Sequence, residues 1–157
     1  MKISLRKSIA SDLEVFFQNQ ADEEANFMAA FTSKNPQDKD AYIKKWTGLM
    51  TVDSVHMQTI MLADQAVGCV VKFVMEGDSD ITYALDKKYW GKGIVTSAVK
   101  QFLAIEKTRP IHGRVAYDNY GSQKVLEKAG FTKIGSNVDF AIARGKEIEE
   151  YIYKLDN

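Results

Sequence analysis

A pair of glycines one residue apart constrains the fold of this chain more than any other feature. The pair lies in Lys87–Thr96, KKYWGKGIVT, between an apolar run that ends near Leu85 and a helical pattern that begins near Gly93. Glycine weakens strand and helix interiors, but it allows sharp bends and close approach of a ligand to the backbone. The pair therefore marks a strand-to-helix turn, where unpaired amides and the helix dipole favour an anion.

This turn predicts a phosphate-binding loop, because Gly91 and Gly93 let successive backbone amides converge on one phosphate group. Three lysines and a hydroxyl would assist: Lys87, Lys88, Lys92 and Thr96. The alternative is a plain glycine-rich connector with solvated lysines. The spacing excludes a P-loop, and a dinucleotide fingerprint would need a third glycine where Thr96 stands.

Composition limits the class of protein. A chain of 157 residues, 45% apolar and 27% charged, predicts one globular domain over residues 1–157. Lys plus Arg and Asp plus Glu both number 21, so the basic surplus of nucleic-acid-binding proteins is missing. No apolar run approaches the ~18 residues of a membrane span, and no signal peptide is evident. We therefore expect a cytoplasmic protein.

Cysteine and histidine usage predicts neither an internal disulfide nor a metal site. The single Cys69 cannot form an internal disulfide, and no neighbouring feature marks it as an activated nucleophile. It is expected in the core. His56 and His112 do not belong to a metal-ligand spacing, so no metal site is predicted.

Hydrophobic periodicity predicts an α/β (α+β) fold with a single mixed, mostly antiparallel central sheet flanked by helices. Ser11 is expected to cap the first helix and Pro36 to begin a later one, while residues 21–35 stay ambiguous. The predicted order is a strand near 3–9, helices, three strands from Val55 to Leu85, a helix to Lys107, a strand at Ile111–Tyr117, a helix ending at Gly130, and strands at 131–135 and 149–155.

Two motifs resemble a known family. Lys88–Gly93, KYWGKG, is similar to the Gln/Arg-x-x-Gly-x-Gly/Ala signature of the GNAT N-acetyltransferases, with Lys88 where Gln or Arg is usual. The strings ITYALDKKYWGKGIVTSAV and DNYGSQKVLEKAGFTKIG resemble its ribosomal-protein N-terminal acetyltransferase (RimJ/RimL-like) branch. The resemblance follows the element order of nearly the whole chain and is strongest from Asp80 to Gly135. It implies the acyl-CoA N-acyltransferase fold and acetyl-CoA as co-substrate.

The resemblance also implies a cofactor site. The pyrophosphate would lie on the amides of residues 91–96, and the pantetheine arm would follow the strand that ends at Leu85, in a slot opened where that strand splays from Ile111–Tyr117. Asn119 matches the family's Asn at the following helix, and Lys124 either reaches phosphate or is an ordinary exposed lysine. The implied cofactor-binding residues are Leu85, Lys88, Trp90, Gly91, Lys92, Gly93, Ile94, Val95, Thr96, Asn119, Ser122 and Lys124.

For the chemistry, the resemblance suggests a carboxylate that acts through water, which here is Asp80. The alternative is that Asp80 only belongs to the Gly-Asp-Ser-Asp turn. Leu126 stands where many family members have a general-acid Tyr. Ser122, Tyr120 or water would then assist the departing thiolate, or the thiolate would leave at neutral pH without an acid. Tyr83 either lines the acceptor slot or packs in the core.

These observations predict an N-acetyltransferase that transfers acetyl from acetyl-CoA to a primary amine by direct attack in a ternary complex. The acceptor is either a protein N-terminus or a small-molecule amine. The main alternative is a catalytically silent acyl-CoA-binding or regulatory domain, since the usual Tyr is missing. No nucleic-acid or membrane partner is expected, and a homodimer is left open.

Overall fold

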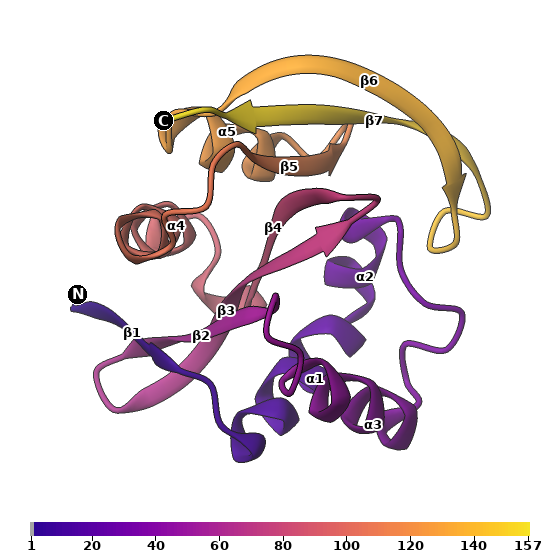
Figure 1. Ribbon diagram of the computed structural model, residues 1–157. Helices are drawn as coiled ribbons and strands as arrows, with labels where there is room; N and C mark the ends of the chain where they lie inside the picture. The colour runs from indigo at the N-terminus through magenta and orange to yellow at the C-terminus, as the bar shows by residue number, and fades with distance from the viewer. Residues whose placement is uncertain (1) are drawn as a thin grey trace.

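The computed structural model describes residues 2–157, which form one seven-stranded sheet of order β1-β2-β3-β4-β5-β7-β6 (Figure 1). Neighbouring strands are antiparallel except β4 and β5, which are parallel. The predicted mixed, mostly antiparallel sheet is therefore confirmed. The strands are β1 (Ile3–Lys7), β2 (His56–Leu62), β3 (Gln65–Met75), β4 (Asp78–Leu85), β5 (Ile111–Ala116), β6 (Thr132–Ala141) and β7 (Lys146–Leu155).

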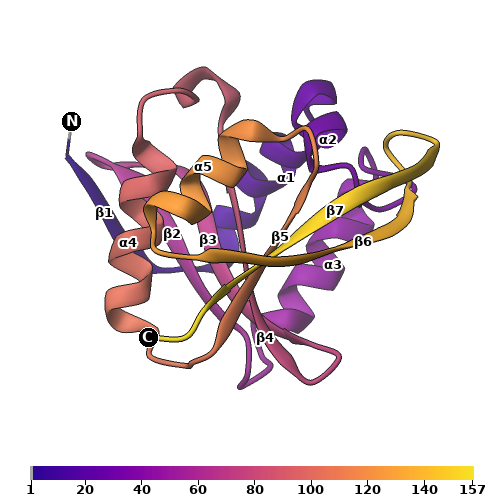
Figure 2. The same ribbon diagram turned by 90° about the horizontal axis from the view of Figure 1, so that it is seen from above.

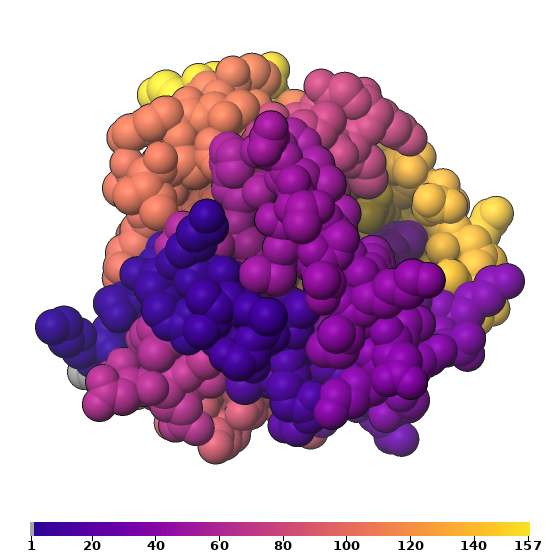
Figure 3. All heavy atoms as spheres, turned by 60° about the horizontal axis from the view of Figure 1, so that its bottom comes forward, coloured from indigo at the N-terminus to yellow at the C-terminus, as the bar shows by residue number. Residues whose placement is uncertain are grey.

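Helices cover both faces of the sheet. They are α1 (Leu13–Ala21), α2 (Glu23–Ala29), α3 (Lys39–Leu49), α4 (Ile94–Ile105) and α5 (Tyr120–Lys128), with 3-10 turns η1 (Ala10–Asp12) and η2 (Lys87–Tyr89). The α4 and α5 helices lie on one face, while α1, α2 and α3 lie on the other (Figures 1 and 2). The N-terminal segments, coloured indigo to purple, form much of the surface seen in Figure 3.

The two faces enclose separate apolar cores, and β3 contributes to both. Val70 packs with the buried side of α4, whereas Cys69 and Val71 pack with Leu13 and Phe16 of the α1 region. A strand that is buried on both faces reads as a nearly continuous apolar run, which is why β3 was recognisable in the sequence. No helix within residues 2–157 has the length and apolar character needed to cross a membrane.

Two predicted helix starts are wrong. Ser11 lies inside η1, and Asp12 is buried, where its carboxylate accepts hydrogen bonds from Arg6, Thr59 and the Ile9 amide. The α3 helix begins at Lys39 rather than at Pro36, since Asp38 caps it by accepting from the Ala41 amide. The ambiguous segment contains α2.

The closing strands are longer than predicted. The β6 and β7 strands form a long curved hairpin whose tip reaches α2 (Figures 1 and 2), where the Arg144 Nε donates to the Phe27 carbonyl at 2.7 Å. Every residue of β6 except Ala141 is exposed. Because an exposed strand needs no alternating apolar pattern, most of its length could not be recognised in the sequence.

Gly68 makes the closest backbone approach in the sheet, and this yields a prediction. A Cβ at Gly68 would lie 2.2 Å from the Ala84 carbonyl oxygen, a backbone atom that cannot rotate away. We expect Gly68→Ala to lower the free energy of unfolding by about 3 kcal/mol in urea denaturation. Gly48, near the end of α3, has nothing within 4 Å of a built Cβ, so Gly48→Ala should be neutral or stabilise by about 0.5 kcal/mol. Equal stability of the two variants would contradict this account.

Candidate active site

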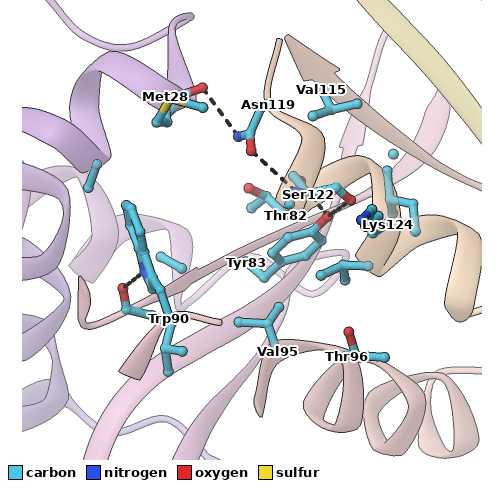
Figure 4. A pocket seen from close by; sticks show the side chains of 18 of the residues that line it. Met28, Thr82, Tyr83, Trp90, Val95, Thr96, Val115, Asn119, Ser122 and Lys124 are labelled. Atoms are coloured by element: carbon cyan, nitrogen blue, oxygen red, sulfur yellow. Dashed lines mark hydrogen bonds between the residues drawn. The ribbon is translucent and has the colours of Figure 1, made fainter. Parts of the chain in front are cut away.

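A cleft of about 820 Å³ opens where β4 and β5 part (Figure 4). The two strands pair only at Asp80–His112 and Ile81–Gly113. Beyond these pairs, residues 82–85 of β4 stay paired with β3 while β5 diverges with β7. Their free edge therefore borders the cleft, together with α2, the start of α4 and α5.

The start of α4 presents a run of free backbone amides to the cleft. The Trp90 amide donates to the Lys87 carbonyl and the Ser97 amide to that of Gly93, but within residues 2–157 no protein acceptor receives the amides of residues 91–96. Six successive unpaired N–H groups at a helix N-terminus form a strong anion site. The loop expected from the glycine pair has this character.

Gly91 and Gly93 are needed for their backbone conformation. Their φ angles are +75° and +76°, in the left-handed region that L side chains rarely adopt. A Cβ at either position would meet nothing within 4 Å, so steric room is not the constraint within the chain itself. Trp90 fixes the loop against the sheet, because its Nε1 donates to the Leu85 carbonyl at 2.9 Å.

The structure brings most of the predicted cofactor residues to this cleft. Those that line it are Leu85, Trp90, Gly91, Gly93, Ile94, Val95, Thr96, Asn119, Ser122 and Lys124, together with Tyr83. Two predicted residues, Lys88 and Lys92, are not among the described residues that line the cleft. Lys88 lies over the Tyr89 ring, at 5.1 Å from its centroid.

Lys87 contacts carboxylates instead of an anion site. Its Nζ lies 3.0 Å from Asp22 Oδ1 and 3.8 Å from Glu24 Oε1, and pairing with Asp22 raises the pKa of the lysine. Asp22 also caps α2 by accepting from the Ala25 amide. The lysine therefore links the glycine loop to α2, and its expected place among the phosphate ligands is not what the geometry shows.

A hydroxyl pair crosses the cleft between β4 and α5. Tyr83 Oη lies 2.6 Å from Ser122 Oγ, and it also donates to the Ser122 carbonyl at 3.2 Å (Figure 4). Burial raises the pKa of Tyr83, so its hydroxyl stays protonated. Tyr120, by contrast, is 67% exposed and lies outside the residues that line the cleft. Its predicted role stays a prediction without a supporting contact.

Asn119 holds the cleft together from the opposite side. Its Oδ1 accepts from the Ser122 amide at 3.2 Å and caps α5, while its Nδ2 donates to the Met28 carbonyl at 3.3 Å (Figure 4). One side chain thus joins α5 to α2 across the cleft. Leu126 lies deeper, and its side chain packs against Gly113. A Cβ built at Gly113 would come within 2.8 Å of the Leu126 side chain.

Asp80 is not part of the turn before β4. It lies within the strand, 2% exposed, with its Oδ2 3.4 Å from Arg114 Nε and its Oδ1 3.9 Å from His112 Nδ1. Burial raises the pKa of Asp80, and the charges of Arg114 and His112 partly oppose that rise. The carboxylate lies behind the cleft wall, next to Arg114, which lines it.

Sequence reasoning did not single out Arg114 or Glu150, which the structure places at the closed end of the cleft. Glu150 Oε1 lies 3.6 Å from Arg114 Nη1, and burial raises the pKa of this carboxyl as well. A usable signal existed, because Arg114 is a cation in the apolar strand IHGRVA.

The remaining candidates lie outside the site. Cys69 is buried, and burial raises the pKa of its thiol to about 12, so the predicted core role is confirmed. His56 pairs with Glu106 at the far end of α4. Residues 2–157 hold no cluster of His, Cys, Asp and Glu suited to a metal ion.

A parted sheet beside a helix terminus with free amides is the architecture of acyl-CoA N-acyltransferases. The family model described as "Acetyltransferase (GNAT) domain" matches residues 2–132, so the chain belongs to the GNAT acetyltransferase family. It is 26% identical to an uncharacterized N-acetyltransferase, p20, of Bacillus licheniformis over 98% of this chain and 92% of the relative.

Solved structures show the same fold. RimL, a ribosomal-protein alpha-N-acetyltransferase in complex with coenzyme A, superposes with a TM-score of 0.85 at 16% identity, covering 99% of this chain and 94% of RimL. Spermidine N-acetyltransferase from Vibrio cholerae, in complex with CoA and spermine, superposes with a TM-score of 0.84 at 15% identity, covering 98% and 95% of the two chains.

The left-handed glycines predict a separable effect on cofactor affinity. Alanine in the left-handed region costs about 1–2 kcal/mol, so Gly93→Ala should shift the free amides and weaken CoA binding by about 10-fold or more in isothermal titration. Gly77→Ala is the matched control, because Gly77 has φ +84° and an equally open Cβ site in the turn before β4. It should lose similar stability and keep CoA affinity. Unchanged affinity in Gly93→Ala would contradict the assignment of this loop.

Proposed function

We propose that the protein transfers the acetyl group of acetyl-CoA to a primary amine by direct attack in a ternary complex. The observation that carries this proposal is the run of free amides at residues 91–96, which opens onto the gap between β4 and β5. The amides suit a pyrophosphate, and the edge of β4 that has lost its strand partner suits the amide groups of a pantetheine arm. Membership of the GNAT family supports both roles.

The cofactor arm would run from the start of α4 toward the closed end of the cleft. Residues 82–85 would donate and accept hydrogen bonds that β5 no longer makes, and one of their amides would polarise the thioester carbonyl. Lys124 of α5, which lines the cleft, would add positive charge near the phosphates. The acetyl group would then lie near Ile81 and Gly113, where the two strands meet.

Asp80 is the proposed general base, acting through a water molecule. Its Oδ1 is buried without a hydrogen-bond partner in residues 2–157, and its raised pKa makes it a better proton acceptor than an exposed carboxylate. The amine nitrogen loses a proton toward Asp80 and attacks the carbonyl carbon, and the C–S bond then breaks. An α-amine, with a pKa near ~8, asks less of this base than a lysine side chain near ~10.

Ser122 is the proposed proton donor to the departing thiolate. Tyr83 would return a proton to Ser122, and solvent water would reprotonate Tyr83. The two hydroxyls are in hydrogen-bond contact at the cleft. Leu126, at the position of the usual Tyr, has no hydroxyl that could donate a proton. We expect Ser122→Ala and Tyr83→Phe each to lower kcat by about 10- to 100-fold with an unchanged KM for acetyl-CoA. Tyr120→Phe removes an exposed hydroxyl on the same helix and should leave kcat unchanged. Equal kcat values in all three variants would remove this role.

A catalytically silent acyl-CoA-binding domain is the competing function, since the position of the usual general-acid Tyr holds Leu126. Titration with acetyl-CoA, followed by a thiol-release assay over a panel of amines, separates the two. Tight binding together with thiol release that depends on the amine supports the transferase. Tight binding without such release on any amine supports the silent domain, and stronger thermal stabilisation by ATP or NAD than by CoA would overturn both.

Asp80 gives a prediction on pH. Because its pKa is raised, the protonated and inactive form should persist above the usual carboxyl range, and kcat/KM should rise as pH increases through that raised pKa. Asp80→Asn should lower kcat by about 100-fold and leave CoA affinity within twofold. Full turnover of Asp80→Asn across the pH range would show that another group accepts the proton.

A further inference from the structure

Several buried polar atoms without hydrogen-bond partners belong to the wall of the cleft or lie next to it. Within residues 2–157 there are five such atoms, and three belong to residues that line the cleft: Asn26 Oδ1, Thr32 Oγ1 and Arg114 Nε. A fourth, Asp80 Oδ1, belongs to the carboxylate that contacts Arg114. A buried polar group without a partner is costly, and native proteins rarely keep several in one place without a ligand or water. The cleft wall is therefore suited to receive polar atoms, and Arg114 with Asp80 supplies two of these groups where β4 and β5 part.

Arg114 has the donors that the surrounding groups lack. Within the described chain its guanidinium makes no hydrogen bond, and its contacts with Asp80 and Glu150 are ion pairs at 3.4 and 3.6 Å. These two carboxylates hold the Arg114 side chain in position. A guanidinium offers five N–H groups in a planar fork, which matches a carboxylate or carbonyl oxygen of a ligand.

The position of Arg114 relates it to the reacting atoms. Gly113 is the last residue of β5 paired with β4, so Arg114 is the first residue beyond the point where the strands part. Ile111 and Val115 pack in the core that contains α4, whereas Ala116 packs with Ala30 on the other face. Because side chains alternate along a strand, His112 and Arg114 share the face of Ala116, which is the face of α2. The guanidinium thus lies on the acceptor side, opposite the face covered by α4 and α5.

The charges at this end suit a ligand of both signs. Two carboxylates, Asp80 and Glu150, face one guanidinium, and Asp78 and Asp139 are further negative charges in the neighbourhood. His112 is the other titratable group in contact. An ammonium group is favoured by the negative excess, while the Arg114 fork needs an acceptor oxygen close to that ammonium.

We propose that the closed end of the cleft is an acceptor subsite for an α-aminoacyl group, in which a carbonyl or carboxylate lies one carbon away from the reacting amine. Arg114 donates to the oxygen of that group. Asn26 Oδ1 and Thr32 Oγ1 receive the N–H groups of the acceptor. This inference rests on the proposed acetyltransferase function and narrows its substrate. Simple alkylamines and polyamines lack the oxygen that Arg114 requires.

The test compares acceptors with and without this oxygen at equal concentrations of the neutral amine, because a neighbouring carbonyl also lowers the pKa of the amine. Phenylalanine and phenylalaninamide are assayed against 2-phenylethylamine, and alanyl-alanine and alanine against ethylamine, with spermine as a polyamine. We expect kcat/KM for the carbonyl-bearing acceptors to exceed that of their decarboxylated twins by at least about 10-fold, as for a hydrogen bond to a charged group. Preference for the free acids indicates a small-molecule acceptor, and preference for the amide and dipeptide indicates peptide N-termini. Both support the subsite, and equal rates for the twins, or a preference for spermine, overturn it.

Variants connect the preference to Arg114. Arg114→Lys keeps the charge between the two carboxylates and removes the planar fork, so the ratio between twins should fall toward one while the KM for acetyl-CoA stays unchanged. Thr32→Val is a second variant from the other wall and should also reduce the ratio. The control is Arg109→Lys, because Arg109 also has a buried unpartnered Nε but contacts carbonyls at the end of α4. An unchanged ratio in Arg114→Lys would sink the proposal.

Failure of the proposed function is distinguishable from failure of the subsite. If wild-type protein acetylates none of these amines, binding of phenylalaninamide to the CoA-loaded protein is measured by titration. Binding that Arg114→Lys weakens by about 10-fold or more supports the subsite without turnover. Absence of binding, or binding insensitive to Arg114→Lys, overturns it.

Discussion

The parting of β4 from β5 is the constraint on which the site depends. A parallel pair that stays together for only two residue pairs leaves the rest of one strand edge unsatisfied, and such an edge is costly unless something else takes its hydrogen bonds. The pairing of β5 with β7 draws β5 away, whereas β3 holds β4 along its whole length. Each candidate role in the site follows from where the residue lies along this gap, between the point where the strands part and the start of α4.

Side-chain hydrogen bonds connect the two walls of the cleft. Tyr83 bonds to Ser122 across the slot, and Asn119 joins α5 to the carbonyl of Met28 in α2. The glycine loop is tied to the same wall, since Trp90 donates to the Leu85 carbonyl and the Asp86 amide donates to Val67. The glycine loop and the gap are thus both fixed to β4, which gives a bound ligand a defined path between them.

The sequence predicted the parts of this fold that depend on local chemistry. The glycine loop was evident because Gly91 and Gly93 combine with a strand before and a helix after them. Asn119 was found through the motif that resembles the GNAT family, and the structure shows that it caps α5. Asp80 could not be placed, because only the register with His112 and Arg114 shows that it is buried within the sheet rather than in a turn. The contacts of Arg114 with Asp80 and Glu150 escaped prediction for the same reason.

Long-range contacts also explain the other errors. Ser11 was expected to cap the first helix, but its neighbour Asp12 accepts hydrogen bonds from Arg6 and Thr59, and Ser11 lies within η1. Lys87 was expected among the phosphate ligands, but its ammonium group pairs with Asp22. In each case a charged side chain interacts with a residue of another element, and the local sequence does not show that partner.

The free amides at the start of α4 link occupancy to the integrity of the whole molecule. This helix supplies Ile94, Ala98, Val99 and Phe102 to the larger apolar core, so its first turn belongs to the cooperative unit rather than to a loose appendage. A ligand that binds only the native state adds RT ln(1 + [L]/Kd) to the unfolding free energy, about 2.7 kcal/mol at a hundredfold excess over Kd. The abundance of folded protein in a cell would then follow the supply of the small molecule that fills this helix end, which makes the protein's lifetime a readout of that supply.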